Sequence, residues 1–219
     1  AQPTKVASHY IFGQLLLWLM VLEFFFYIAA EIGFSNWIVT AVSQSAAISL
    51  ALAAPVATAF WLGLTISRLL SAHVIKHALL RENQVICICI IGGGLSGLLV
   101  ALFPAQLVVA FGASALFGFF LGPLFPGLIA IASRWFVDKL NTISSALLLS
   151  TGISAMIFPA AMGLLIPVIG FNWVMTIPAL GCLLIIVPFA LAIIKQRRTL
   201  QLRGEEHTIE ENSPLSTPG

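Results

Sequence analysis

Charged residues are scarce in this chain of 219 residues: Asp, Glu, Lys and Arg make up 8% of it, whereas 60% is hydrophobic. A soluble domain carries about 25% charged residues, so the composition excludes a soluble fold. The net charge is only +2, which gives no basis for binding nucleic acid. The chain is therefore expected to sit in a lipid bilayer.

Histidine is missing from the apolar stretches, because all four histidines fall near the termini or in a polar loop. The three cysteines lie in apolar segments without metal-ligand spacing, so we expect no metal site and no cofactor. Ser96, in GLSG, matches the nucleophile signature of rhomboid-type intramembrane proteases. A serine nucleophile needs a nearby base, and no apolar stretch supplies a histidine. An intramembrane enzyme or a channel is thus a distant alternative, and no catalytic residue is predicted.

Six apolar runs are long enough to cross a bilayer, which takes about 20 residues per helix. They predict an all-α integral membrane protein, a six-helix bundle over residues 11–195. The expected spans are 11–41, 46–71, 85–103, 106–134, 143–168 and 172–194. The first exceeds what a bilayer needs, and we expect it to tilt, to protrude or to break; a break is expected at Gly33–Asn36, where Gly and small polar residues weaken a helix.

Positive charge falls on one side of these six spans. The positive-inside rule makes that side cytoplasmic and puts both termini there. The opposite loops carry no Lys or Arg. All ten basic residues obey the pattern: Lys5, Arg68, Lys76, Arg81, Arg134, Lys139, Lys195, Arg197, Arg198 and Arg203.

The two ends of the chain are polar. Residues 1–10 are expected to form a cytoplasmic stub, and residues 196–219 a disordered, acidic cytoplasmic tail. Because the chain begins with Ala and lacks a signal-peptide layout, we expect an internal fragment or a processed product. A plasma membrane or inner membrane is the expected location.

Two glutamates interrupt the most apolar part of the first span. Glu23, Tyr27 and Glu31 follow at four-residue spacing, so they form one stripe along a helix. A carboxyl group at bilayer depth is costly unless it faces water, a partner or a ligand, and such residues usually mark a pathway. This acidic stripe (Glu23, Tyr27, Glu31) therefore predicts a helix that lines a polar cavity and binds a solute or a proton.

Small residues and prolines recur in the middle spans. Small residues four apart let membrane helices approach closely. The pairs with that spacing are Gly63/Ser67, Gly93/Gly97, Gly118/Gly122 and Pro159/Gly163. Pro123 and Pro126 in the fourth span remove backbone hydrogen bonds, so that helix is expected to bend, as helices around transporter sites do.

Several segments resemble helices of the major facilitator superfamily, and more narrowly its fucose permease-like branch of sugar–proton symporters. FFYIAAEIGFSNWIVT (25–40) is similar to helix seven of that branch, and FWLGLTISRLL (60–70) to helix eight, with Arg68 at its arginine position. FGFFLGPLFPGLIAIA (117–132) resembles helix ten, and residues 150–170 resemble helix eleven. The loop after Arg68 departs from the superfamily's Gly-x-x-x-Asp-Arg-x-Gly-Arg pattern.

The resemblance implies the C-terminal six-helix half of a twelve-helix transporter, with an N-terminal half as partner. It implies alternating-access transport of a small polar solute, a sugar first of all, with a proton as possible coupling ion. A non-sugar solute or a drug is the alternative within the superfamily. The expected solute-contacting residues are Glu31, Tyr27, Trp37, Glu23, Asn36, Thr151 and Ser154, while Arg68 is expected to act as a cytoplasmic gate or anchor.

Overall fold

The computed structural model describes residues 15–76, 82–136, 140–196 and 198, and these form helices joined by short turns. Six helical stretches among them are long and apolar enough to cross a membrane, which confirms the all-α, six-span prediction. The expected stub, 1–10, and nearly all of the expected tail, 196–219, lie outside the described residues. The helices are α2 (Leu15–Ser45), α3 (Leu50–Ala53), α4 (Pro55–Lys76), α5 (Glu82–Leu102), α6 (Leu107–Leu121), α7 (Leu124–Trp135), α8 (Leu140–Val174) and α9 (Thr176–Leu184).

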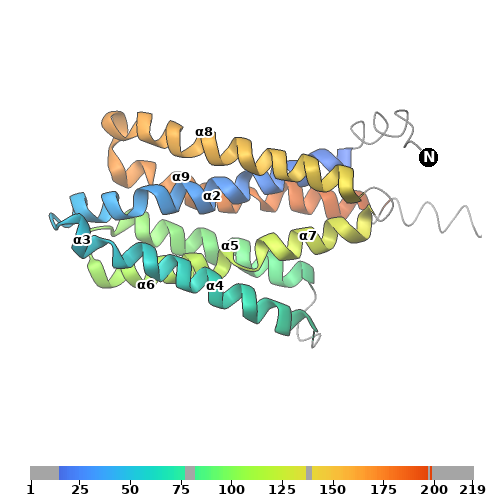
Figure 1. Ribbon diagram of the computed structural model, residues 1–219, viewed down its shortest axis with the longest axis horizontal. Helices are drawn as coiled ribbons and strands as arrows, with labels where there is room; N and C mark the ends of the chain where they lie inside the picture. The colour runs from blue at the N-terminus through green and yellow to red at the C-terminus, as the bar shows by residue number, and fades with distance from the viewer. Residues whose placement is uncertain (1–14, 77–81, 137–139, 197, 199–219) are drawn as a thin grey trace, which may run out of the picture.

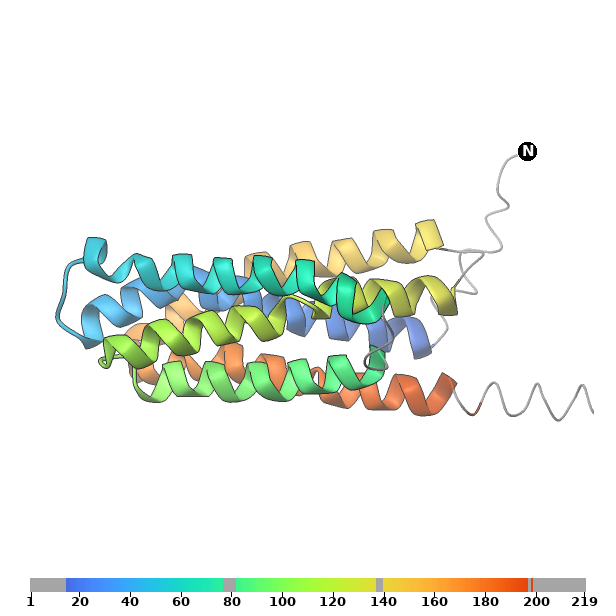
Figure 2. The same ribbon diagram turned by 90° about the horizontal axis from the view of Figure 1, so that it is seen from below.

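The six spans run along the long axis of the bundle, and consecutive spans run in opposite directions (Figures 1 and 2). The start of α2, the end of α4 and the end of α7 lie at the same end of the bundle, on the right in Figure 1. That end carries Lys76 and Arg134, so the arrangement keeps together the charges that the positive-inside rule would place in the cytoplasm.

Helix α2 runs without interruption from Leu15 to Ser45, so the expected break at Gly33–Asn36 is wrong. Gly33 is buried, and α8 packs closely against it: a Cβ at this position would lie only 3.0 Å from Sδ of Met162. The Asn36 amide donates to the carbonyl of Ile32 at 2.8 Å, one turn back, and so it stays within the helix. Packing against α8 thus outweighs the weak helix propensity of this segment.

The fourth span is bent, as its prolines predict. Helix α6 ends at Leu121 and α7 begins at Leu124, and the two segments meet at Gly122 and Pro123. Proline cannot donate to the preceding turn, so the helical ladder is interrupted there.

Helices α4 and α6 cross at very close range through their small residues. A Cβ at Gly63 would overlap the carbonyl oxygen of Ala115, and a Cβ at Gly118 would overlap that of Phe60. One turn further, a Cβ at Gly122 would overlap the hydroxyl of Ser67. The two small-residue pairs predicted from four-residue spacing therefore face each other, with backbone against backbone.

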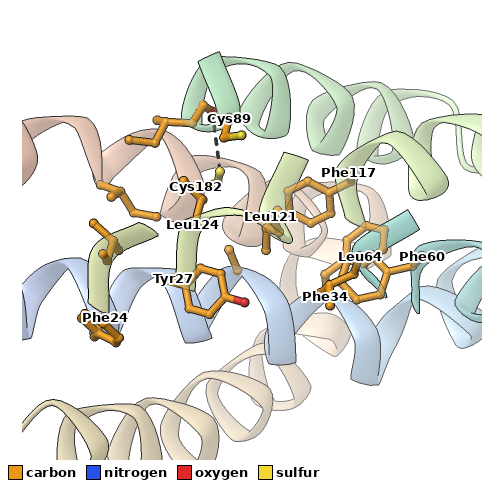
Figure 3. Close-up of a cluster of buried hydrophobic side chains, with 14 of the residues drawn as sticks. Phe24, Tyr27, Phe34, Phe60, Leu64, Cys89, Phe117, Leu121, Leu124 and Cys182 are labelled. Atoms are coloured by element: carbon orange, nitrogen blue, oxygen red, sulfur yellow. Dashed lines mark hydrogen bonds between the residues drawn. The ribbon is translucent and has the colours of Figure 1, made fainter. Parts of the chain in front are cut away.

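The fifth and sixth spans are separated at Gly170. Its φ of 80° and ψ of 164° break the path of α8, and a residue with a side chain would be strained there. Beyond α9, residues 186–196 are again helical. Figure 3 shows the core that the bundle encloses, where Cys182 of α9 bonds to the backbone of α5 at Ile90, 3.5 Å away.

Candidate functional site

A polar cluster joins the first two spans in the interior of the bundle. The Tyr27 hydroxyl donates to the Glu31 carboxylate one turn away on α2. Arg68 of α4 reaches both: its Nη2 lies 2.7 Å from the Tyr27 oxygen and 3.2 Å from Oε2 of Glu31. Each member of this polar cluster (Tyr27, Glu31, Arg68) bonds to the other two.

The cluster is buried on one side and open on the other. Tyr27 is fully buried among the core side chains of Figure 3, and the Glu31 side chain is only 8% exposed. The Arg68 side chain is 39% exposed, so the cluster is open on the side of the guanidinium. A buried carboxylate without a counter-charge is strongly destabilising, which explains why Glu31 is held by a cation and a hydroxyl.

An aromatic side chain packs against the cluster from the bent fourth span. The Phe125 ring, at the start of α7, lies 5.9 Å from the guanidinium carbon of Arg68 and 5.8 Å from the Tyr27 ring. A cation near the face of an aromatic ring within about 6 Å is attracted by the ring quadrupole. The polar cluster therefore contacts the helix segment that follows the Gly122–Pro123 break.

Glu23, the third member of the acidic stripe, is placed differently. It is 1% exposed, and its Oε1 has no hydrogen-bond partner among the described residues. The structure thus brings Tyr27, Glu31 and Arg68 together and leaves Glu23 one turn before Tyr27 on α2.

Comparison with known protein families identifies the chain. The family model of the Major Facilitator Superfamily matches residues 12–217. The chain belongs to the Major Facilitator Superfamily. It is therefore a membrane transporter and, with its six apolar helices, a multi-pass integral membrane protein. The search of curated proteins gave no match.

In this transporter the side chains of Trp37 and Asn36 bond to backbone carbonyls outside the polar cluster. The Trp37 indole donates to the carbonyl of Pro159 at 3.0 Å and lies where a Cβ at Gly163 would meet its ring at 2.8 Å. The predicted Pro159/Gly163 pair therefore accommodates an indole from α2. Asn36 is exposed and bonds within its own helix, as described above.

The polar residues of α8 bond to backbone carbonyls. Ser154 donates to the carbonyl of Phe25 at 2.6 Å, and Ser150 donates to that of Val21 at 2.9 Å. Thr151 donates to Leu148 on its own helix. The two serines thus attach α8 to α2, whereas Thr151 bonds within its own helix.

Arg68, predicted as a cytoplasmic gate or anchor, is brought by the structure into contact with Tyr27 and Glu31. One signal marks it: it is the only basic residue within the apolar body of its span, with Glu31 as an acid of opposite charge in the preceding span. Phe125 carried no such signal, because its contact with Arg68 depends on where α7 begins. In the described part of the transporter, no three His, Cys, Asp or Glu side chains gather to hold a metal ion.

Proposed function

We propose that this chain forms the C-terminal six-helix half of a secondary active transporter that moves a sugar or sugar-like solute by alternating access, coupled to protons. The observation that carries the proposal is the polar cluster of Tyr27, Glu31 and Arg68, in which Tyr27 and Glu31 are buried in a core built mainly from apolar side chains. Intramembrane ionisable residues that face the bundle interior typically mark substrate pathways.

The charge of the cluster favours a neutral, hydroxylated solute. Glu31 and Arg68 compensate each other, so the cluster presents hydrogen-bond donors and acceptors without net charge. A sugar hydroxyl both donates and accepts, and it can therefore bond to the guanidinium and the carboxylate together. The resemblance of residues 25–40 and 60–70 to the fucose permease-like branch supports the same solute class.

The proposed mechanism uses the bent fourth span. When the two halves of the transporter rock about the site, α7 and its Phe125 change position relative to Arg68, which opens or covers the polar cluster. We place both termini in the cytoplasm, because the basic residues follow the positive-inside pattern. The solute then meets Glu31 and Tyr27 from the open side of Arg68.

Uptake measurements test this function. The full-length transporter is expressed in cells and tested with radiolabelled hexoses, pentoses and deoxy-sugars, next to amino acids and a cationic dye. We expect uptake of a sugar and its loss in Glu31→Gln, with equal membrane insertion. Glu82→Gln, a matched change at the end of the bundle, keeps uptake. Transport of the dye or an amino acid in place of every sugar overturns the sugar assignment, and normal uptake kinetics in Glu31→Gln remove that residue from the site.

A further inference from the structure

Glu23 is a buried acid that the polar cluster does not use. Its side chain belongs to the same helix as Tyr27 and Glu31, yet it is 1% exposed and Oε1 has no hydrogen-bond partner among the described residues. The other glutamate of the stripe, Glu31, accepts from a hydroxyl and a guanidinium. Two carboxyls eight residues apart on one helix therefore have different surroundings.

Among the described residues, no ion pair joins Glu23 to a cation of the helices packed against α2. Helices α3, α6 and α8 contain no Asp, Glu, Lys, Arg or His, and the one titratable side chain of α9 is Cys182. Lys195 lies further along the sixth span, near the end of the helical residues 186–196. Helix α4 carries Arg68, already bonded to Glu31, and His73 and Lys76 near its end. Helix α7 carries Arg134 in its last turn, where it pairs with Glu82.

Nearby hydroxyls are also engaged. Ser150 and Ser154 of α8 bond to the carbonyls of Val21 and Phe25, the residues two before and two after Glu23. Tyr27, one turn along α2, donates its proton to Glu31. The hydroxyl groups of Tyr27, Ser150 and Ser154 thus donate to acceptors other than Glu23.

An ionised carboxylate in such surroundings would carry a full uncompensated charge. Removing an isolated ionised carboxylate from water costs so much that the group is neutralised instead. Of the two buried carboxyls of α2, Glu31 pairs with the guanidinium of Arg68, and Glu23 has no ion pair among the described residues. The second negative charge has to be neutralised by a bound proton or by another cation.

We propose that Glu23 is the proton-carrying residue of this half and that Glu31, held by Arg68, stays ionised and contacts the solute. Glu23 is protonated in the conformation described here. When the site opens, its carboxylic acid releases the proton to water and becomes a carboxylate, and it takes up a proton again before the site closes. This assignment of coupling rests on the proposed transport function, but the protonation state of Glu23 does not.

The two acids are set apart along the helix. At 1.5 Å per residue, Glu23 lies about 12 Å from Glu31 along the axis, with Tyr27 between them. Glu23 is nearer the end of the bundle where α2 begins. Proton and solute therefore use separate carboxyls, with Tyr27 between them along the helix, and neither has to displace the other.

Infrared difference spectroscopy tests the protonation state without any solute. The full-length transporter, reconstituted in sodium-free liposomes at neutral pH, is expected to show the C=O stretch of a protonated carboxylic acid in an apolar environment, shifted in D2O. We expect this band to disappear in Glu23→Gln and to remain in Glu31→Gln. A band that persists in Glu23→Gln overturns the proposal, as does a spectrum without the band. Thermal stabilisation by added NaCl that Glu23→Gln abolishes would identify sodium as the occupant and also overturn it.

A transport measurement tests the coupling. With a sugar that the wild type takes up, an inward-directed pH gradient is expected to stimulate uptake in the wild type and in Glu82→Gln, and to give no stimulation in Glu23→Gln. Equal stimulation in Glu23→Gln overturns the coupling role. If the wild type takes up no sugar, the proposed function fails, whereas the infrared band still decides the state of Glu23.

Discussion

The molecule contains two arginine–glutamate pairs that connect helices, and they sit in contrasting surroundings. Arg68 and Glu31 join α4 to α2 inside the bundle, where the glutamate side chain is 8% exposed. Arg134 and Glu82 join α7 to α5 at the end of the bundle, where the arginine side chain is 57% exposed. The end pair (Glu82, Arg134) is also joined by a second bond, from Nη1 to Oε1 at 2.8 Å.

The end pair has two bonds between its charged groups, yet we expect it to contribute less to the stability of the fold than the interior pair does. At the exposed end, water and salt replace much of what the end pair contributes, and such pairs are worth about 0–1 kcal/mol. Inside the bundle, the loss of one partner leaves the other charge buried, so the interior pair has far greater consequences when broken. Only the interior pair lies in the proposed solute pathway, so breaking it should affect transport as well as stability, whereas breaking the end pair should leave transport unchanged.

Removing the interior cation is expected to have the largest effect. Arg68→Leu leaves the Glu31 carboxylate buried without a counter-charge, and breaking such a pair costs about 3–5 kcal/mol. We expect a large drop in the thermal unfolding midpoint of the purified transporter and loss of solute uptake. A midpoint equal to that of the wild type would show that Glu31 is not charged in this bundle.

The double variant Arg68→Leu/Glu31→Leu sharpens the comparison. Replacing a buried ion pair by apolar residues is often neutral or stabilising. The unfolding midpoint should return to that of the wild type or exceed it, while uptake remains absent. Recovery of uptake together with stability would contradict a role of the pair in solute binding.

Removing the hydroxyl between the two charges has an intermediate effect. Tyr27→Phe deletes a donor to Glu31 and an acceptor for Arg68, and a hydrogen bond to a charged group contributes about 1.5–3 kcal/mol. The ion pair itself remains, so the protein should fold with a moderately lower midpoint. We expect uptake with a raised KM; an unchanged KM would place Tyr27 outside the solute site.

Breaking the end pair is expected to have the smallest effect. Arg134→Gln should lower stability by about 0–1 kcal/mol and leave uptake unchanged. The difference between this variant and the wild type should also shrink at high salt, because exposed charges are screened. Thermal unfolding at low and high ionic strength measures both. A large, salt-independent loss would mean that the end pair is shielded from water.

Sequence reasoning identified the features that depend on local spacing. The six spans, the bend at Pro123 and the facing pairs Gly63/Ser67 and Gly118/Gly122 all follow from hydropathy, proline chemistry and four-residue periodicity. Membership of the Major Facilitator Superfamily was also predicted, from the order of the segments that resemble its helices, and it is confirmed.

The features missed in the sequence depend on contacts between distant segments. The Gly33–Asn36 segment stays helical because Met162 and the rest of α8 pack against it. The indole of Trp37 bonds to Pro159, 122 residues away, and its contact with solute stays a prediction. The bond of Arg68 to Tyr27, 41 residues away, could not be read from the sequence either, whereas its role as a cytoplasmic gate or anchor stays a prediction.

The close crossing of α4 and α6 has a consequence for the position of the arginine. A Cβ at Gly122 would overlap the Ser67 hydroxyl and lie 3.2 Å from the backbone nitrogen of Arg68. Gly122 also lies between the end of α6 and Pro123, where the fourth span is interrupted. The interruption of that span and the backbone that carries the cation therefore touch each other. A side chain at position 122 would push directly on the segment that holds Arg68 beside Glu31, so the absence of a side chain there is a condition for the interior ion pair.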